Sequence, residues 1–208
     1  MRTRVKICGF TQTEQAVHAA KLGVDAIGLV FYPASPRYLS IEQAQKIVQA
    51  LPAFTSVVAL FVDEKPAQIK IVLENVAIDC LQFHGNETAA QCRIYGKPYL
   101  KAIQMRAAVN IAQLSQDYED AAGLLLDAYH PDVKGGMGQT FDWDLIPAQV
   151  AVPIILAGGL CVENVKQAVQ TVKPYAVDVS SGVESIKGVK DVAKMAAFIT
   201  AVNQVDRI

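Results

Sequence analysis

Short apolar runs alternate with longer amphipathic segments from one end of the chain to the other. The short runs are rich in β-branched residues and are bounded by glycine, proline or polar residues, which is typical of strands. The eight runs that predict strands are 5–9, 26–31, 55–62, 80–85, 99–105, 123–128, 153–159 and 176–182. Apolar residues at helical spacing between them predict a repeated strand–helix unit.

Several helix ends can also be predicted from local signals. Two residue pairs have the spacing of a capping box, Thr11 with Glu14 and Ser40 with Gln43. Pro66 suits a first helical turn and Gly23 suits a helix end. We expect the last helix over about residues 191–202, where the apolar spacing is again helical.

The repeated unit determines the fold class that we expect. Successive strand–helix units imply parallel strands joined by right-handed crossovers. Eight units can close into a barrel or stay open as a doubly wound sheet, and the count of eight favours closure. No linker or low-complexity segment interrupts the alternation. The sequence therefore predicts an α/β fold, a (β/α)8 TIM barrel, with residues 1–208 forming a single domain.

Composition and charge exclude several classes of protein. Apolar residues make up 52% and charged residues 19%, which indicates a globular chain with a sizeable core. A net charge of −1 gives no general field that would attract nucleic acid or anionic lipid. No apolar run approaches the roughly 20 residues that span a bilayer, and no signal peptide is evident. We expect a cytoplasmic protein with no nucleic-acid or membrane partner, whose four cysteines stay reduced.

Glycine and serine follow the last two predicted strands, at the end of a barrel where functional sites lie. Gly158, Gly159 and Gly182 would let backbone N–H groups approach a ligand closely. Ser180 and Ser181 add hydroxyl groups beside them. A single Gly-Gly pair is usually only a tight turn, so it is the two loops together that predict a phosphate site.

The first strand ends in Cys8, which is followed directly by Gly9. Because strand side chains alternate, Lys6 and Cys8 are expected to point toward the barrel axis, with Gly9 allowing a sharp turn beyond the thiol. The Lys6 cation is expected to lower the thiol pKa from about 8.5, which would suit Cys8 to act as a base. Asp178 has the matching parity on strand eight and is the predicted partner of the buried Lys6 charge, and we also expect it to contact the substrate. An inert packed cysteine is the alternative.

Other side chains at the strand ends are candidates for chemistry. Asp127 ends a very apolar run, and burial there would favour a protonated carboxyl that can act as an acid, although it could also simply cap the loop. Arg37 has a planar fork that suits a carboxylate ligand, or it is a solvated loop charge. His84 is a weaker candidate for substrate contact. His18 and His130 have no partner at ligand spacing, so no metal site is expected.

Six motifs in order along the chain, KICG.T, SPR, Q.HG.E, LLLDA…GG.G..FDW, LAGGL..ENV and DVSSGVE…G.KD, resemble the phosphoribosylanthranilate isomerase family of tryptophan biosynthesis. The resemblance implies a (β/α)8 barrel that catalyses an Amadori rearrangement of a small-molecule substrate, as a monomer or homodimer, with no cofactor. It also implies that Cys8 is the general base, Asp127 the general acid and Arg37 the partner of the anthranilate carboxylate. The loops after strands seven and eight would hold the phosphate.

The chain departs from the family pattern at three positions, Met137, Cys161 and Lys187. Met137 matters most, because its loop is expected to close over substrate. Two alternatives stay open: the related aminoaldose–ketose isomerase of histidine biosynthesis, and a non-catalytic barrel that binds a phosphate ligand. Cys8 and a single evident phosphate site argue against the first. The combination of Cys8, Arg37 and Asp127 argues against the second.

Overall fold

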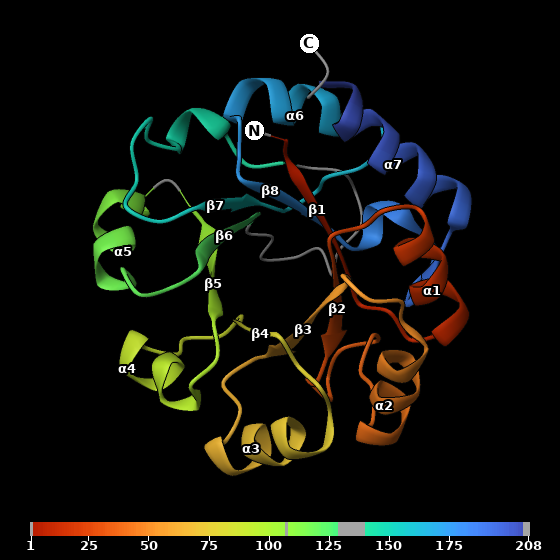
Figure 1. Ribbon diagram of the computed structural model, residues 1–208. Coiled ribbons are helices and arrows are strands. Elements are labelled where there is room, and N and C mark those ends of the chain that lie inside the picture. Colours follow the sequence, from red (N-terminus) through yellow and green to blue (C-terminus); the bar gives the residue numbers. More distant parts are fainter. Residues whose placement is uncertain (1, 107, 129–139, 206–208) are drawn as a thin grey trace.

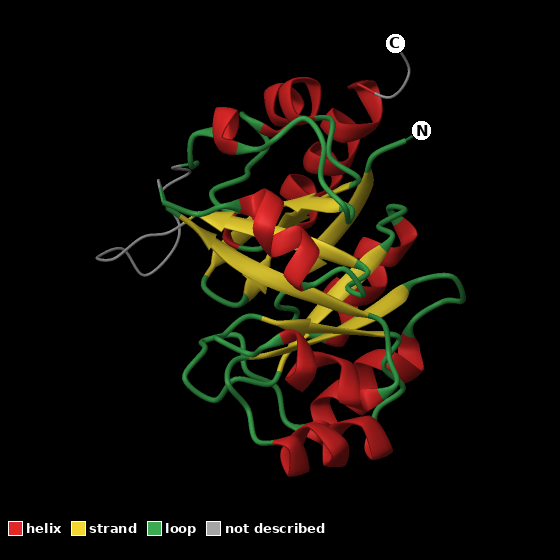
Figure 2. Ribbon diagram, turned by 90° about the vertical axis from the view of Figure 1, so that its left-hand side faces the viewer, coloured by secondary structure: helices red, strands yellow, loops and turns green. Residues whose placement is uncertain are grey.

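Eight parallel strands close into a barrel in the order β1 to β8, with helices around the outside (Figures 1 and 2). The computed structural model describes residues 2–106, 108–128 and 140–205. The strands are β1 (Arg4–Cys8), β2 (Ala26–Val30), β3 (Ser56–Phe61), β4 (Cys80–Phe83), β5 (Tyr99–Met105), β6 (Gly123–Ala128), β7 (Ile154–Leu156) and β8 (Ala176–Val179). The predicted (β/α)8 architecture is therefore confirmed.

The helices differ in length, from 4 residues in α4 to 14 residues in α7. The α-helices are α1 (Thr13–Lys21), α2 (Ile41–Ala50), α3 (Pro66–Asn75), α4 (Ala89–Cys92), α5 (Ile111–Asp117), α6 (Val165–Val172) and α7 (Val192–Val205). Three short 3-10 helices accompany them, η1 (Arg93–Tyr95), η2 (Trp143–Leu145) and η3 (Ser181–Val183). Among the described residues between β6 and β7, only η2 is helical. Within the described ranges no helix has the length and apolar character needed to cross a membrane.

Three of the predicted helix signals are confirmed. Ser40 and Gln43 form a capping box at the start of α2, in which each side chain accepts a hydrogen bond from the other residue's backbone N–H. Pro66 is the first residue of α3. Gly23 follows α1 with a φ of +87°, a conformation in which glycine has no steric cost.

The capping box predicted for Thr11 is wrong. Helix α1 begins at Thr13, after Gln12, whose side chain makes no capping hydrogen bond. The Thr11 hydroxyl instead donates to the carbonyl of Gly188, 2.6 Å away. The Thr11 hydroxyl therefore makes its hydrogen bond with a loop that is distant in sequence and does not cap helix α1.

The strands bury two different faces. Val5 and Ile7 are almost fully buried in the large core between strands and helices. Cys8 belongs to a separate cluster inside the barrel, with Val30 and Leu60. The predicted alternation along β1 is therefore correct, and Cys8 faces the interior of the ring.

A short antiparallel hairpin follows β8, made of β9 (Glu184–Ile186) and β10 (Val189–Lys190). Its glycine, Gly188, has a φ of +82°, and a Cβ there would lie 3.1 Å from the carbonyl oxygen of Pro36. The hairpin therefore lies against the loop that follows β2. This contact brings residues of the hairpin to the same rim of the barrel as Arg37.

Candidate active site

The end of β1 explains why a glycine directly follows the thiol. Gly9 has a φ of +83°, and a Cβ at that position would lie 2.3 Å from Cδ of Arg37. Gly9 thus permits both the turn and the close passage of the arginine side chain. On the neighbouring strand, a Cβ at Gly28 would lie 2.5 Å from Sγ of Cys8. Two glycines leave the space that Cys8 and Arg37 occupy.

Lys6 and Asp178 form the predicted ion pair beneath Cys8. The Lys6 Nζ donates to Asp178 Oδ1 at 2.8 Å, and the two side chains are 5% and 9% exposed. Burial works against the lysine charge, but the charge of Asp178 and the hydrogen bond to it, together with the nearby Cys8 sulfur, hold the pKa of Lys6 above its ordinary value. The pairing is confirmed, whereas a direct contact between Asp178 and a substrate stays a prediction.

The expected lowering of the Cys8 pKa is wrong. Burial raises the pKa of this thiol above its ordinary value, although the nearby Lys6 charge acts in the opposite direction. The Asp178 carboxylate, paired with that lysine, adds to the increase. Because the lysine charge is largely compensated by its partner, it cannot offset the loss of water around the sulfur. Before a ligand binds, Cys8 is therefore held as a thiol at neutral pH.

Asp127 and His84 meet across the rim. His84 Nε2 lies 3.1 Å from Asp127 Oδ2, and the two side chains are 22% and 31% exposed. The burial expected for Asp127 is thus only partial. The other ring nitrogen, Nδ1, lies 3.0 Å from the amide nitrogen of the fully buried Gln82. If that amide donates to Nδ1, the ring proton resides on Nε2 and is donated to Oδ2 of Asp127, which leaves Oδ1 to carry a carboxyl proton.

Arg37 is held by a carboxylate that sequence reasoning missed. Its Nε and Nη2 donate to the two carboxylate oxygens of Glu184 at 2.7 and 2.8 Å. Lys190 Nζ donates to the same carboxylate at 2.8 Å. Arg37 is consequently not a freely solvated loop charge. No local signal could reveal this pair, since Arg37 and Glu184 are 147 positions apart.

The glycine loops after β7 and β8 lie against each other. Gly158 and Gly159 have φ values of +78° and +69°. A Cβ at Gly182 would lie 2.0 Å from the carbonyl oxygen of Leu160, so the backbones of the two loops are in direct contact. The side chain of Asn164 donates to the Gly159 carbonyl at 2.9 Å and stabilises the first loop. The structure therefore brings together the residues predicted to hold a phosphate.

The two serines of the second loop have different surroundings. The Ser180 hydroxyl donates to the backbone carbonyl of Cys8 at 3.0 Å and accepts from Lys190 at 3.3 Å. It therefore links β8 to the end of β1. Ser181 begins η3 and is half-buried. Because the Ser180 hydroxyl is already engaged, the Ser181 hydroxyl and the backbone N–H groups of the two glycine loops are better candidates for binding an anion.

All these groups share the carboxyl-terminal end of the strands. Asp178 lies on β8, which pairs with β1 and is two strands from β6, so along the ring it stands between Cys8 on β1 and Asp127 on β6. Within the described ranges, no three His, Cys, Asp or Glu side chains form a group that could hold a metal ion. His130 and Met137 lie outside the described residues. A thiol and a carboxyl on one rim, beside two glycine-rich loops, are suited to proton transfer on a bound small molecule.

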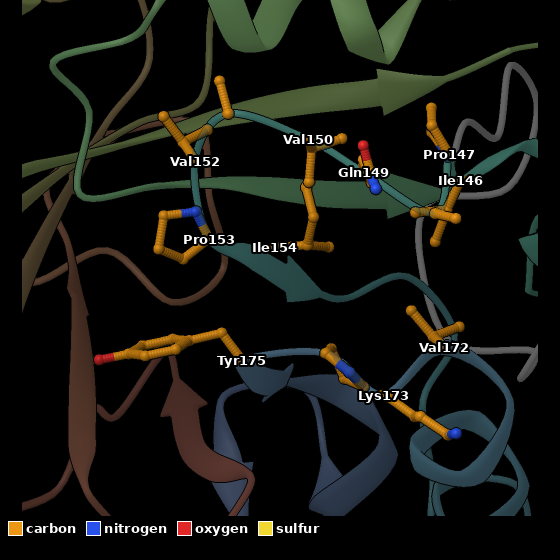
Figure 3. A pocket seen from close by; sticks show the side chains of 13 residues that line it. Ile146, Pro147, Gln149, Val150, Val152, Pro153, Ile154, Val172, Lys173 and Tyr175 are labelled. Carbon is orange, nitrogen blue, oxygen red and sulfur yellow. The ribbon is translucent and has the colours of Figure 1, made fainter. Parts of the chain in front are cut away.

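A groove of about 630 Å³ lies outside the candidate active site (Figure 3). It is lined by residues 146–154 and 172–175, which lead into β7 and β8. It therefore lies at the amino-terminal ends of these strands, opposite the rim that carries Cys8 and Asp127. The groove takes no part in the candidate active site.

Known proteins resemble this chain over nearly its whole length. The family model described as N-(5'phosphoribosyl)anthranilate (PRA) isomerase matches residues 5–201. An N-(5'-phosphoribosyl)anthranilate isomerase from Nitrosococcus oceani is 55% identical over 206 residues, which cover 99% of this chain and 100% of the relative.

Two crystal structures support the same comparison. The phosphoribosyl anthranilate isomerase from Thermotoga maritima is 37% identical with a TM-score of 0.86, covering 97% of this chain and 99% of the other. A second structure of such an isomerase contains reduced 1-(o-carboxyphenylamino)-1-deoxyribulose 5-phosphate. It is 36% identical with a TM-score of 0.83, at the same coverage of 97% and 99%.

Proposed function

The chain belongs to the N-(5'-phosphoribosyl)anthranilate isomerase family, and we propose that it catalyses the Amadori rearrangement of N-(5'-phosphoribosyl)anthranilate to 1-(2-carboxyphenylamino)-1-deoxyribulose 5-phosphate in tryptophan biosynthesis. The observation that carries the proposal is the gathering of Cys8, Asp127 and Arg37 at one rim of the barrel with the glycine loops after β7 and β8. The ligand of one solved relative has a carboxyl, a sugar and a phosphate. These three groups correspond to Arg37, the acid–base pair and the glycine loops.

The proposed mechanism uses one acid and one base. Asp127 gives a proton to the ribose ring oxygen, the C1'–O bond breaks, and the amine nitrogen forms an iminium with C1'. Cys8 then removes the proton from C2', and the electron pair neutralises the iminium to give an enolamine that tautomerises to the ketose. Groups of this kind each contribute about 10²–10⁴-fold to the rate.

The raised pKa of Cys8 is compatible with this order of events. The base is required only after ring opening, when the substrate carries a positive iminium. A positive charge close to the thiol favours its deprotonation. We therefore expect Cys8 to release its thiol proton to solvent water when the iminium forms, so that the thiolate exists only in the presence of the intermediate.

The remaining assignments concern binding and organisation. Arg37 binds the anthranilate carboxylate, while Gly158, Gly159, Gly182 and Ser181 bind the phosphate, helped by Ser180. His84 contacts Asp127 and keeps it oriented. Residues 1–208 act as one catalytic domain, as a monomer or homodimer, and a cytoplasmic location remains our expectation.

The Cys8→Ser and Asp127→Asn variants test the proposal. Each should lose at least about a hundredfold in kcat while keeping its circular dichroism spectrum, because each removes one proton-transfer group. Turnover is followed by the loss of substrate fluorescence. Cys80→Ser is the matched control, since Cys80 begins strand β4, and it should retain normal kcat.

The same assay separates the alternatives. A non-catalytic barrel would bind the product analogue without quenching substrate fluorescence. An isomerase of histidine biosynthesis would turn over the corresponding aminoaldose of that pathway instead. If either Cys8→Ser or Asp127→Asn keeps more than about a tenth of wild-type kcat, that residue does not have the role assigned to it.

A further inference from the structure

We infer that Glu184 is a positioning residue, which holds the Arg37 guanidinium in the orientation required by a ligand carboxylate. The inference rests on the proposed function, because that proposal assigns the carboxylate of the substrate to Arg37. Glu184 itself need not touch the substrate. Its effect is on the direction and freedom of the arginine.

The geometry of the pair supports this role. Glu184 accepts from Nε and Nη2 of Arg37 through two separate oxygens, at 2.7 and 2.8 Å. A two-point contact of this kind fixes the plane of a guanidinium as well as its position. It uses one side of the planar fork and leaves the Nη1 end for a ligand. Arg37 is 20% exposed whereas Glu184 is 5% exposed, so the arginine is the member of the pair that a ligand can reach.

Lys190 keeps the cluster positively charged. Its fully buried Nζ donates to Oε1 of Glu184 at 2.8 Å. Burial opposes ionisation of Glu184, but its contacts with Arg37 and Lys190 hold the pKa of that carboxyl below its ordinary value. Two cations then share one anion, which leaves one positive charge uncompensated. A ligand carboxylate would complete a neutral set of two positive and two negative groups.

The cluster is also anchored on several elements, so it exists before a ligand arrives. The backbone N–H of Lys190 donates to the side chain of Gln15 at 2.9 Å, and its Nζ donates to the Ser180 carbonyl at 3.0 Å. The hairpin, α1 and the end of β8 therefore jointly fix Glu184 and Lys190. A side chain that is already ordered loses less conformational freedom on binding.

The cluster lies close to the candidate base. A Cβ at Gly9, the residue after Cys8, would lie 2.3 Å from Cδ of Arg37, and the Ser180 hydroxyl that accepts from Lys190 donates to the Cys8 carbonyl. A carboxylate at the free end of Arg37 would therefore place an attached ring and sugar near the thiol. The orientation of Arg37 thus bears on where the reacting carbon lies.

The inference is tested with two ligands that differ in one group. They are reduced 1-(o-carboxyphenylamino)-1-deoxyribulose 5-phosphate and the same compound without its carboxyl group, and their affinities are measured by calorimetry. Wild type should prefer the carboxylated ligand. Glu184→Gln should lower that preference about tenfold, raise KM and leave the affinity for the carboxyl-free ligand within about twofold. Glu74→Gln, a carboxylate on α3, is the control and should change neither.

The sign of the change separates positioning from charge. Removing a negative charge beside Arg37 would, by Coulomb attraction alone, tighten binding of the carboxylated ligand. If Glu184→Gln leaves the preference unchanged or increases it, while Arg37→Ala abolishes it, Glu184 is not a positioning residue. If Arg37→Ala itself keeps the preference, the assignment of Arg37 in the proposed function fails, and this inference fails with it. Should Glu184→Gln not fold, Glu184→Asp gives the same test, because its shorter side chain must also lower the preference.

Discussion

Replacing Asp178 with asparagine should destabilise the protein strongly, because the change leaves a buried lysine without its counter-charge. The Lys6–Asp178 contact is 2.8 Å long, and the two side chains are 5% and 9% exposed. Water cannot replace the lost carboxylate at such a buried position. Removing one member of a buried ion pair typically costs about 3–5 kcal/mol in the free energy of unfolding.

The exposure of the pair decides this magnitude. The Arg93–Asp120 pair has side chains that are 53% and 38% exposed, and pairs of that kind contribute about 0–1 kcal/mol. For a chain of 208 residues, each kcal/mol shifts Tm by about 2–4 °C. Asp178→Asn should therefore lower Tm by about 6–20 °C, whereas Arg93→Met should lower it by at most about 4 °C.

The contribution should also depend on pH in a defined direction. The pKa of Lys6 is raised in the folded protein. Its contribution to stability is therefore fully present below the ordinary lysine pKa of about 10.4, and it is lost as the pH rises through the higher folded-state value. The difference in stability between wild type and Asp178→Asn should stay large at neutral pH and become smaller only in strongly alkaline solution.

Urea unfolding followed by circular dichroism measures these differences, and a double variant gives the sharper result. Lys6→Met/Asp178→Asn removes both charges and should be more stable than Asp178→Asn alone. The reasoning is refuted if Asp178→Asn costs less than about 1 kcal/mol. It is equally refuted if the costs of the two single variants simply add in the double variant.

Three further predictions concern the candidate site. Absorbance near 240 nm reports thiolate, and the difference in this absorbance between wild type and Cys8→Ser measures ionisation of Cys8. The difference should appear only above the pH at which a free cysteine ionises, about 8.5. An increase below that pH would contradict the effect of burial on this thiol. Arg37→Ala should raise KM about ten- to a hundredfold with a smaller change in kcat, because one charge-assisted contact with the substrate is lost. A fall in kcat without a rise in KM, measured by steady-state kinetics, would disprove this assignment. Gly182→Ala should lower the free energy of unfolding by about 1–3 kcal/mol, because the new Cβ would collide with the Leu160 carbonyl. The same collision should weaken the binding of phosphate ligands. Normal stability in thermal unfolding would mean that the two loops are not in contact.

Periodicity and local chemistry were enough to predict the barrel and much of its rim. Eight apolar runs at regular spacing leave few ways to bury them other than a closed parallel sheet. Alternation along a strand then determines which side chains face inward, so the placement of Lys6 and Cys8, and the pairing of Lys6 with Asp178, could be predicted. The capping box of Ser40 could be predicted for the same reason, since it depends only on neighbours in sequence.

Only the tertiary structure decided the features that depend on distant loops and on the extent of burial. The hairpin after β8 takes the Thr11 hydroxyl away from helix α1 and brings Glu184 to Arg37, and no local pattern encodes either contact. The direction of the Cys8 pKa shift was mispredicted because a neighbouring cation is visible in the sequence, whereas the exclusion of water and the compensation of that cation by Asp178 are not. Interactions between neighbours along the chain follow from residue order, but the balance between desolvation and charge depends on how closely the folded chain surrounds each group.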